Sequence, residues 1–223
     1  MSKSRTLGAV ALLATLTLTG CGALQPGTAV EVGDERISIE RVDEVAGDFC
    51  AAIEPQLEEA AETIPHGFFR SGIAGTLALR SVADQLAADF GVEADSDEYL
   101  QTLAEQRQGL LAVPEEYRES VIEIESAPLY VEAVQAAVGE VVLDGEGEAA
   151  DFAAAGVDEF ETWLAENDVE FDPTLNTTIT DGVIGPEDGA LSFAVSDLAV
   201  NGQAQEPNSA LARQLPATQR CGR

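Results

Sequence analysis

The chain has 223 residues, and 45% of them are hydrophobic, which is enough for a folded core and argues against disorder throughout. It carries 41 acidic and 11 basic residues, a formal charge of −30. A surface of this charge repels phosphate backbones, so nucleic acid is excluded as a partner. A partner attracted by charge would be cationic, although a dense acidic surface also serves solubility alone.

The N-terminal segment has the pattern of an export signal. Lys3 and Arg5 give a positive start, and residues 7–18 form an uncharged apolar stretch. That stretch is too short to span a bilayer, which takes about 20 residues. It ends in Leu18-Thr19-Gly20-Cys21, a lipobox in which small residues precede a cysteine that takes a diacylglyceryl group. We expect a lipid anchor on Cys21, with an ordinary signal peptide as the alternative.

This interpretation divides the chain and places it in the cell. Cleavage before Cys21 would leave 9 basic and 41 acidic residues, a formal charge of −32. The exported protein would then be lipid-anchored at the extracytoplasmic face of the cell membrane. The expected regions are a signal peptide at 1–20, a tether at 21–27, an α+β domain at 28–200 and an irregular tail at 201–223 that contains Cys221.

Two cysteines remain once Cys21 is assigned to lipid. In an oxidising compartment, Cys50 and Cys221 predict a disulfide. It would close most of the exported chain, and the chain-entropy estimate for so long a loop is about 5 kcal/mol. The alternative is two reduced cysteines, with Cys50 in the core. Neither has a CxxC partner or a neighbouring histidine, so a catalytic thiol is not expected.

The first elements expected are a hairpin and a helix. Residues 28–38 surround the turn signal Gly33-Asp34. Ser38 is placed to cap a helix, and apolar residues recur at helical spacing over 42–53. Cys50 lies on the apolar face of this helix, where a bridge could hold the C-terminal end.

Further helices follow. Pro55 is expected to start a second helical run, which Pro65-His66-Gly67 breaks. A longer helix is expected over 68–90, with Gly91 as its C-terminal cap. Later helices are expected to begin after Asp95 or Ser96, at Pro114, at Ser126 and Pro128, and at Asp151.

Strands are expected beyond residue 168. Val169 and Phe171 alternate with acids, 177–180 and 183–184 flank a turn, and 191–195 alternate cleanly. The most economical packing joins the terminal strands. We therefore predict an α+β fold, mainly helical, with a small sheet formed from the N-terminal hairpin and C-terminal strands.

Three segments resemble a known family. Residues 32–38 (Val32-Gly33-Asp34-Glu35-Arg36-Ile37-Ser38) resemble the opening of SurA N-terminal-domain proteins. Residues 163–173 resemble the helix-to-strand return in lipoproteins of that group from high-GC Gram-positive bacteria, and 191–196 resemble their closing strand. The resemblance implies an extracytoplasmic chaperone-like module that holds unfolded or partly folded exported chains.

The resemblance carries over no enzyme activity. Full-length relatives often have a parvulin prolyl-isomerase domain, whose active site usually uses histidines. Here His66 is the only histidine and the middle of the chain is expected to be helical, so we expect no isomerase domain. The family has no sharp binding motif, and no binding residues are implied.

Residues with possible chemistry were weighed one by one. His66, between Pro65 and Gly67, is expected to be an exposed loop residue, because no nucleophile or orienting carboxylate accompanies it. The sequence holds no nucleophile elbow, Walker loop, dinucleotide fingerprint or HExxH motif. Asp95-Ser96-Asp97 begins a calcium loop and does not finish it. We expect no catalytic residue, no metal site and no cofactor.

Three functions remain open. The first is a membrane-anchored chaperone-like or peptide- or protein-binding module for exported polypeptides, which predicts an exposed apolar groove between helices. Phe68, Phe69 and Trp163 would line such a groove or else belong to the core. The alternative is a structural or adaptor envelope lipoprotein that binds one folded partner. The third is a hydrolase with an unrecognised acidic site.

Overall fold

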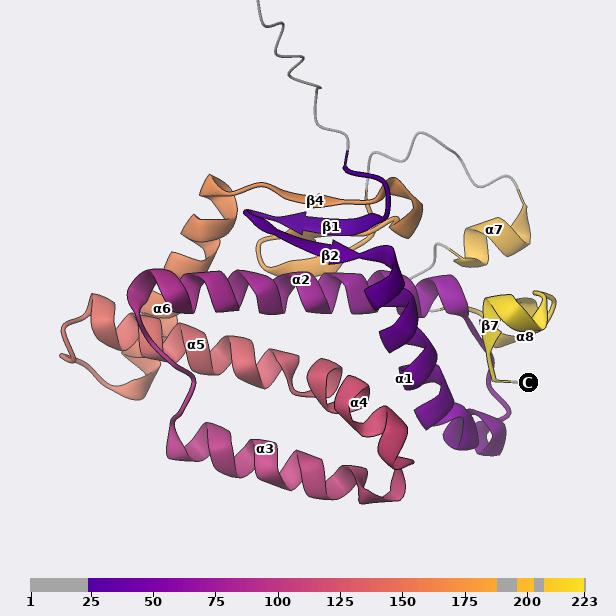
Figure 1. Cartoon of the computed structure of the whole chain (residues 1–223), viewed down its shortest axis with the longest axis horizontal. Coiled ribbons are helices and arrows are strands. Elements are labelled where there is room, and N and C mark those ends of the chain that lie inside the picture. Colours follow the sequence, from indigo (N-terminus) through magenta and orange to yellow (C-terminus); the bar gives the residue numbers. More distant parts are fainter. Residues whose placement is uncertain (1–23, 188–195, 203–206, 223) are drawn as a thin grey trace, which may run out of the picture.

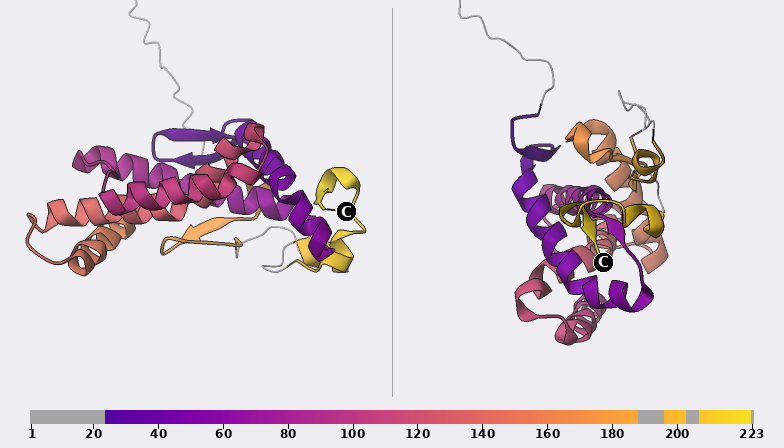
Figure 2. Two further views of the ribbon diagram at one scale, coloured as in Figure 1. Left: turned by 90° about the horizontal axis from the view of Figure 1, so that it is seen from below. Right: turned by 90° about the vertical axis from the view of Figure 1, so that its right-hand side faces the viewer.

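A mainly helical body carries a small antiparallel sheet on one side (Figure 1), as predicted for an α+β chain. The structure is a computed structural model and describes residues 24–187, 196–202 and 207–222. The expected signal peptide and Cys21 lie outside the described residues. Figure 2 shows that the helical body is elongated, with the C-terminal segment packed at one end.

The sheet joins the N-terminal hairpin to a strand from much later in the chain. β1 (Thr28–Val32) pairs with β2 (Glu35–Ser38) on one side and with β4 (Val169–Phe171) on the other, both antiparallel. Gly33 turns the hairpin at a φ of +52°, a left-handed conformation that glycine adopts without steric cost. Val30 and Val32 of the central strand are fully buried, so this sheet is part of the core.

Helix α1 (Ile39–Ala60) follows the hairpin directly. The Ser38 side chain accepts a hydrogen bond from the Arg41 backbone N–H, as predicted for its cap. The helix continues through Pro55, so the separate run expected from that residue is wrong. A proline removes one helical hydrogen bond and favours a bend, and α1 changes direction near its end (Figure 1). It ends at Ala61 in the left-handed conformation.

Helix α2 (His66–Phe90) is the central element (Figure 1). It packs against β1, α1, α5 and α6. Its buried face includes Phe69, Ile73, Leu77, Val82 and Leu86. Gly91 ends the helix at a φ of +66°, as predicted.

Four more helices complete the body. Ser96 caps the first of them through a hydrogen bond from the Tyr99 N–H. They are α3 (Asp97–Gly109), α4 (Arg118–Glu125), α5 (Ala127–Val142) and α6 (Ala149–Glu166). Short 3₁₀ turns lie at Leu110–Ala112, Glu115–Tyr117, Pro173–Leu175 and Ala217–Gln219.

Helices α5 and α6 touch backbone to backbone. A Cβ atom added at Gly139 would lie 1.8 Å from the Phe152 carbonyl oxygen, and one added at Gly156 would lie 1.7 Å from the Gln135 carbonyl oxygen. No side chain larger than hydrogen fits at either place. The two glycines therefore set how closely this helical pair packs.

Some large apolar residues of the helical segments lie at the surface. Leu100, Leu111 and Val157 are 49%, 67% and 38% exposed. On the buried face of α6, Phe160 and Trp163 pack into the core.

A second hairpin follows β4. β5 (Thr178–Thr180) pairs with β6 (Val183–Gly185) through the Asp181-Gly182 turn, both residues at positive φ. This hairpin is separate from the three-stranded sheet, and Ile184 packs on Gly75 of α2. The strand expected at 191–195 lies outside the described residues.

The C-terminal segment is more ordered than the irregular tail expected at 201–223. α7 (Asp197–Gly202) and α8 (Ser209–Ala212) are short helices, and β7 (Arg220–Cys221) pairs with β3 (Ile64–Pro65). The Asn208 side chain caps α8. The Ser209 hydroxyl accepts a hydrogen bond of 2.7 Å from the Thr63 N–H. These contacts attach the segment to the start of α2.

Candidate functional site

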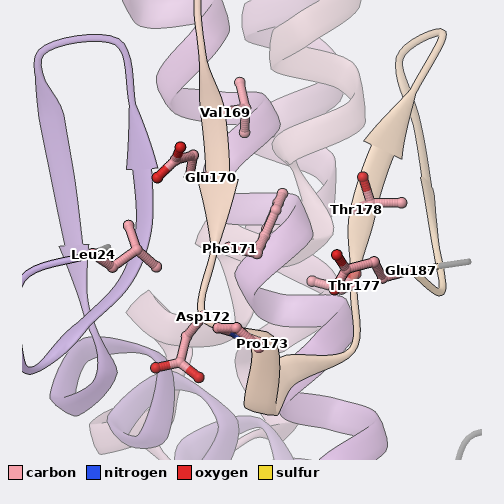
Figure 3. Close-up of a pocket in the computed structure, with 9 residues that line it drawn as sticks. All are labelled: Leu24, Val169, Glu170, Phe171, Asp172, Pro173, Thr177, Thr178 and Glu187. Atoms are coloured by element: carbon pink, nitrogen blue, oxygen red, sulfur yellow. The ribbon is translucent and has the colours of Figure 1, made fainter. Parts of the chain in front are cut away.

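A cavity of about 530 Å³ lies between β4 and β5 (Figure 3), within the size range of ligand pockets. It is lined by Leu24, Val169, Glu170, Phe171, Asp172, Pro173, Thr177, Thr178 and Glu187. Phe171 is half-buried and Glu187 is exposed, so the cavity is open to solvent. It combines apolar, hydroxyl and carboxylate groups.

One wall of this cavity is a strand edge that pairs with no other described strand. Among the described strands the sheet order is β2-β1-β4, so β4 has a described neighbour on one side only. The Asp168 carbonyl accepts from the Gly33 N–H and the Asp172 N–H donates to the Ala29 carbonyl, both toward the β1 side. Backbone groups alternate along a strand, so the N–H and C=O groups of Val169 and Phe171 point away from β1.

The opposite wall of the cavity is also a strand edge, that of β5. β5 pairs only with β6 among the described strands. Its two-residue turn makes Thr180 and Val183 the first hydrogen-bonded pair, so the backbone groups of Ile179 point away from β6. Two strand edges whose outward backbone groups pair with no described strand therefore lie on either side of the cavity.

The side chains of β4 separate by type. Val169 and Phe171 project toward the β5 side, whereas Glu170 projects the other way (Figure 3). Glu187 and Thr177 lie beside β5. Asp172 accepts hydrogen bonds from the N–H and the hydroxyl of Thr174, so this carboxylate caps the turn that follows β4. The site offers apolar contacts within an acidic rim.

The only histidine lies elsewhere, at the start of α2. His66 is the first helical residue and is half-buried, so the expectation of an exposed loop histidine is wrong. Burial lowers the pKa of His66, Arg70 lowers it further, and Asp43 opposes both. Arg70 donates from Nε to Asp43 Oδ1 at 2.5 Å. These residues border an open pocket of about 600 Å³ beside the C-terminal segment.

A third cavity, of about 520 Å³, lies among the helices and is mainly charged. Arg41 forms ion pairs with Glu44 and Glu123, which joins α1 to α4. The Ser120 hydroxyl donates to Asp48 Oδ2 at 2.6 Å. These groups satisfy one another, which is the behaviour of a structural polar contact between helices.

The hydroxyl of Tyr130, beside that cavity, also has a hydrogen-bond partner. The Tyr130 hydroxyl donates to Asp84 Oδ1 at 2.5 Å, and the Arg80 guanidinium lies 4.7 Å from the centre of its ring. Burial, and then Asp84, raise the pKa of Tyr130. A phenol held in its protonated form cannot serve as a base near neutral pH.

The cysteines predicted to pair are brought together. Cys50 in α1 and Cys221 in β7 are joined by a disulfide with their Cα atoms 5.7 Å apart, although 171 positions separate them in sequence. Cys221 is fully buried. The bridge holds the C-terminal segment against α1 and the start of α2.

Two of the three aromatic residues proposed for a groove belong to the core, and Phe68 is half-buried. Phe69 and Trp163 are buried, and the Trp163 indole N–H donates to Asp89 Oδ2 at 3.3 Å. Phe68 packs on Phe69 with ring centres 6.3 Å apart. Phe171 is the aromatic residue that lines the cavity. Its alternation with acidic residues predicted a strand there, and an aromatic side chain in an edge strand is the feature that could have identified it from sequence.

The described residues contain neither a metal-binding cluster nor a helix able to cross a bilayer. Within residues 24–187, 196–202 and 207–222, no cluster of three or more His, Cys, Asp or Glu side chains is arranged to hold a metal ion. In that same part of the chain, no helix has both the length and the apolar character needed to cross a bilayer.

Comparisons with protein-family models, with curated proteins and with solved structures found no match for this chain. The resemblance to SurA N-terminal-domain lipoproteins therefore remains a prediction from the three short segments.

Proposed function

We propose that this chain is a lipid-anchored, extracytoplasmic module that binds segments of exported polypeptides, and that it is not an enzyme. The observation that carries the proposal is the cavity between β4 and β5, where Val169 and Phe171 have backbone groups that pair with no described strand. Backbone groups are common to all polypeptides, so such a site favours chaperone-like binding of many sequences.

Two further features support the proposed location. The lipobox ending in Cys21 follows a leader too short to span a bilayer. The disulfide between Cys50 and Cys221 suits an oxidising compartment outside the cytoplasm. Both features favour a protein that acts on chains after export.

The test is a holdase assay with the lipidated chain in nanodiscs. We expect it to slow the aggregation of a chemically unfolded client protein in proportion to its concentration, whereas empty nanodiscs have no effect. Unchanged aggregation at a several-fold excess of the lipidated chain would contradict the proposal. Crosslinking in cells that captures one stoichiometric folded partner, together with a negative holdase assay, would favour the adaptor alternative.

A further inference from the structure

We propose that the free edge of β4 accepts an extended segment as an added strand, and that the preferred segment carries Lys or Arg among alternating apolar residues. This deepens the proposed function and rests on it: it names how the polypeptide binds and which chemistry is preferred. The carrying observation is the juxtaposition of the β4 and β5 edges across one cavity.

The backbone supplies the affinity in this arrangement. Val169 and Phe171 direct their N–H and C=O groups away from β1, as the hydrogen bonds of Asp168 and Asp172 to the other side require. An incoming strand can pair with these groups in the way that β4 itself pairs with β1. Ile179 offers the same groups from the facing edge.

The side chains supply the preference. Val169 and Phe171 lie on one side of β4, so they can contact every second residue of the added strand. Glu170 and Glu187 are exposed at the rim and have no ion-pair partner within the described part of the chain. Lys or Arg side chains at the intervening positions would meet these carboxylates.

Charge also selects between two occupants of the edge. Charged residues on an edge strand deter pairing between copies of one protein. Copies of this chain, with 41 acidic residues each, repel one another, and the rim carboxylates add to that repulsion. A basic segment from a different chain is attracted by the same field. The occupant is therefore a cationic extended segment rather than a second copy.

The first test uses a synthetic, fluorescently labelled peptide of alternating lysine and valine, titrated into the lipidated chain and followed by anisotropy. We expect saturable binding that weakens as salt rises, and at least tenfold weaker binding of the matched glutamate–valine peptide. The peptide can be N-methylated at either of its two sets of alternate amides. Methylation of the set that faces β4 should weaken binding by about tenfold, which corresponds to one lost hydrogen bond. Equal binding of both N-methylated peptides and the parent would overturn the inference.

The second test changes the protein. Val169→Pro removes an N–H that makes no bond to β1, so the sheet should persist while binding falls about tenfold. Val169→Thr keeps the N–H and the branched shape but places a hydroxyl on the apolar wall, so binding should fall less than it does with Val169→Pro. Thermal unfolding of both variants shows whether each is folded. Glu187→Gln should weaken binding of the lysine peptide and reduce its salt dependence.

The outcomes separate the two levels of the proposal. If unfolded clients are held but N-methylation and Val169→Pro change nothing, the strand-addition inference is wrong and the proposed function stands. If neither clients nor peptides bind, the proposed function is wrong as well. Two other results would also overturn the inference. A dimer that Val169→Pro dissociates would identify a second copy as the occupant. Tenfold tighter peptide binding after Leu191, Phe193 and Val195 are changed to Ser would identify the chain's own segment as the occupant.

Discussion

For single residues, the sequence predicted which residues cap helices better than it predicted how buried a side chain is. Ser38, Ser96 and Gly91 cap helices as expected, because a cap depends on the few residues around it. His66 was misplaced, because it begins a helix and borders a pocket that it shares with the C-terminal segment, which lies about 150 residues away in the chain. No local pattern records that proximity.

The pH dependence of stability should report the environment of His66. Its pKa is lowered in the folded protein, so the unfolded chain binds the proton more readily. The contribution of His66 is therefore absent above its unfolded pKa of about 6.5 and becomes destabilising as the pH falls below that value. His66→Gln should lose less unfolding free energy than the parent between pH 7.5 and 5.5, measured by urea denaturation.

The parent and His66→Gln are compared directly because the carboxylates also titrate in acid. Acidic groups begin to titrate toward pH 5, and they are the same in both proteins, so the difference between parent and variant isolates His66. A parent and a variant with parallel free-energy curves over this range would contradict the lowered pKa.

At the scale of elements, most helices and strands were predictable and their contacts were not. Apolar spacing identified the hairpin, the long helices and β4, since periodicity reflects one buried face. It did not show that Gly139 and Gly156 face each other, because glycine contributes nothing to that periodicity. It also did not show that β4 is the last described strand of its sheet and lies beside β5, since strand order arises from tertiary packing.

The glycine contact between α5 and α6 should be sensitive to a single methyl group. In Gly156→Ala the new Cβ would lie 1.7 Å from the Gln135 carbonyl oxygen, so the helices must separate. We expect a loss of about 3 kcal/mol and a Tm lower by about 10 °C, measured by circular dichroism.

Gly72→Ala is the matched control for this substitution. Gly72 lies within α2 and a Cβ there meets no atom within 4 Å, so alanine should stabilise the protein by about 0.5–1 kcal/mol through helix propensity alone. Similar Tm values for the two variants would show that α5 and α6 can move apart at no cost.

At the scale of the whole molecule, the fold class was predicted correctly and the end of the chain was not. The α+β class followed from the order of the patterns, hairpin, helices and then strands. The C-terminal segment is polar and lacks periodicity, so its short elements could not be read from sequence. They are ordered by tertiary contacts such as the pairing of β7 with β3.

Breaking the disulfide should release this segment first. In the Cys50→Ser, Cys221→Ser double variant we expect a loss of up to about 5 kcal/mol and faster cleavage by trypsin after Arg213 and Arg220, followed by mass spectrometry. Reduction of the parent under denaturing conditions should yield two alkylatable thiols. Unchanged stability and cleavage would mean that the segment is held without the bridge.

The proposed anchor has an equally direct test in cells. Cys21→Ser should abolish incorporation of a labelled fatty acid and shift the protein from the membrane fraction to the soluble or uncleaved form. Labelling that persists in the variant would place the lipid elsewhere.

The redox state of Cys50 should report how far the proposed export of the chain has progressed. In the proposed export from the N-terminus, Cys50 would emerge 171 positions before the cysteine that it is bonded to in the fold, so it would remain a lone thiol for most of translocation. The covalent ring can close only once β7, which contains Cys221 and pairs with β3, has arrived. A trapped mixed disulfide on Cys50 would therefore mark a chain caught partway through the membrane, and the closed ring would mark one that has fully crossed.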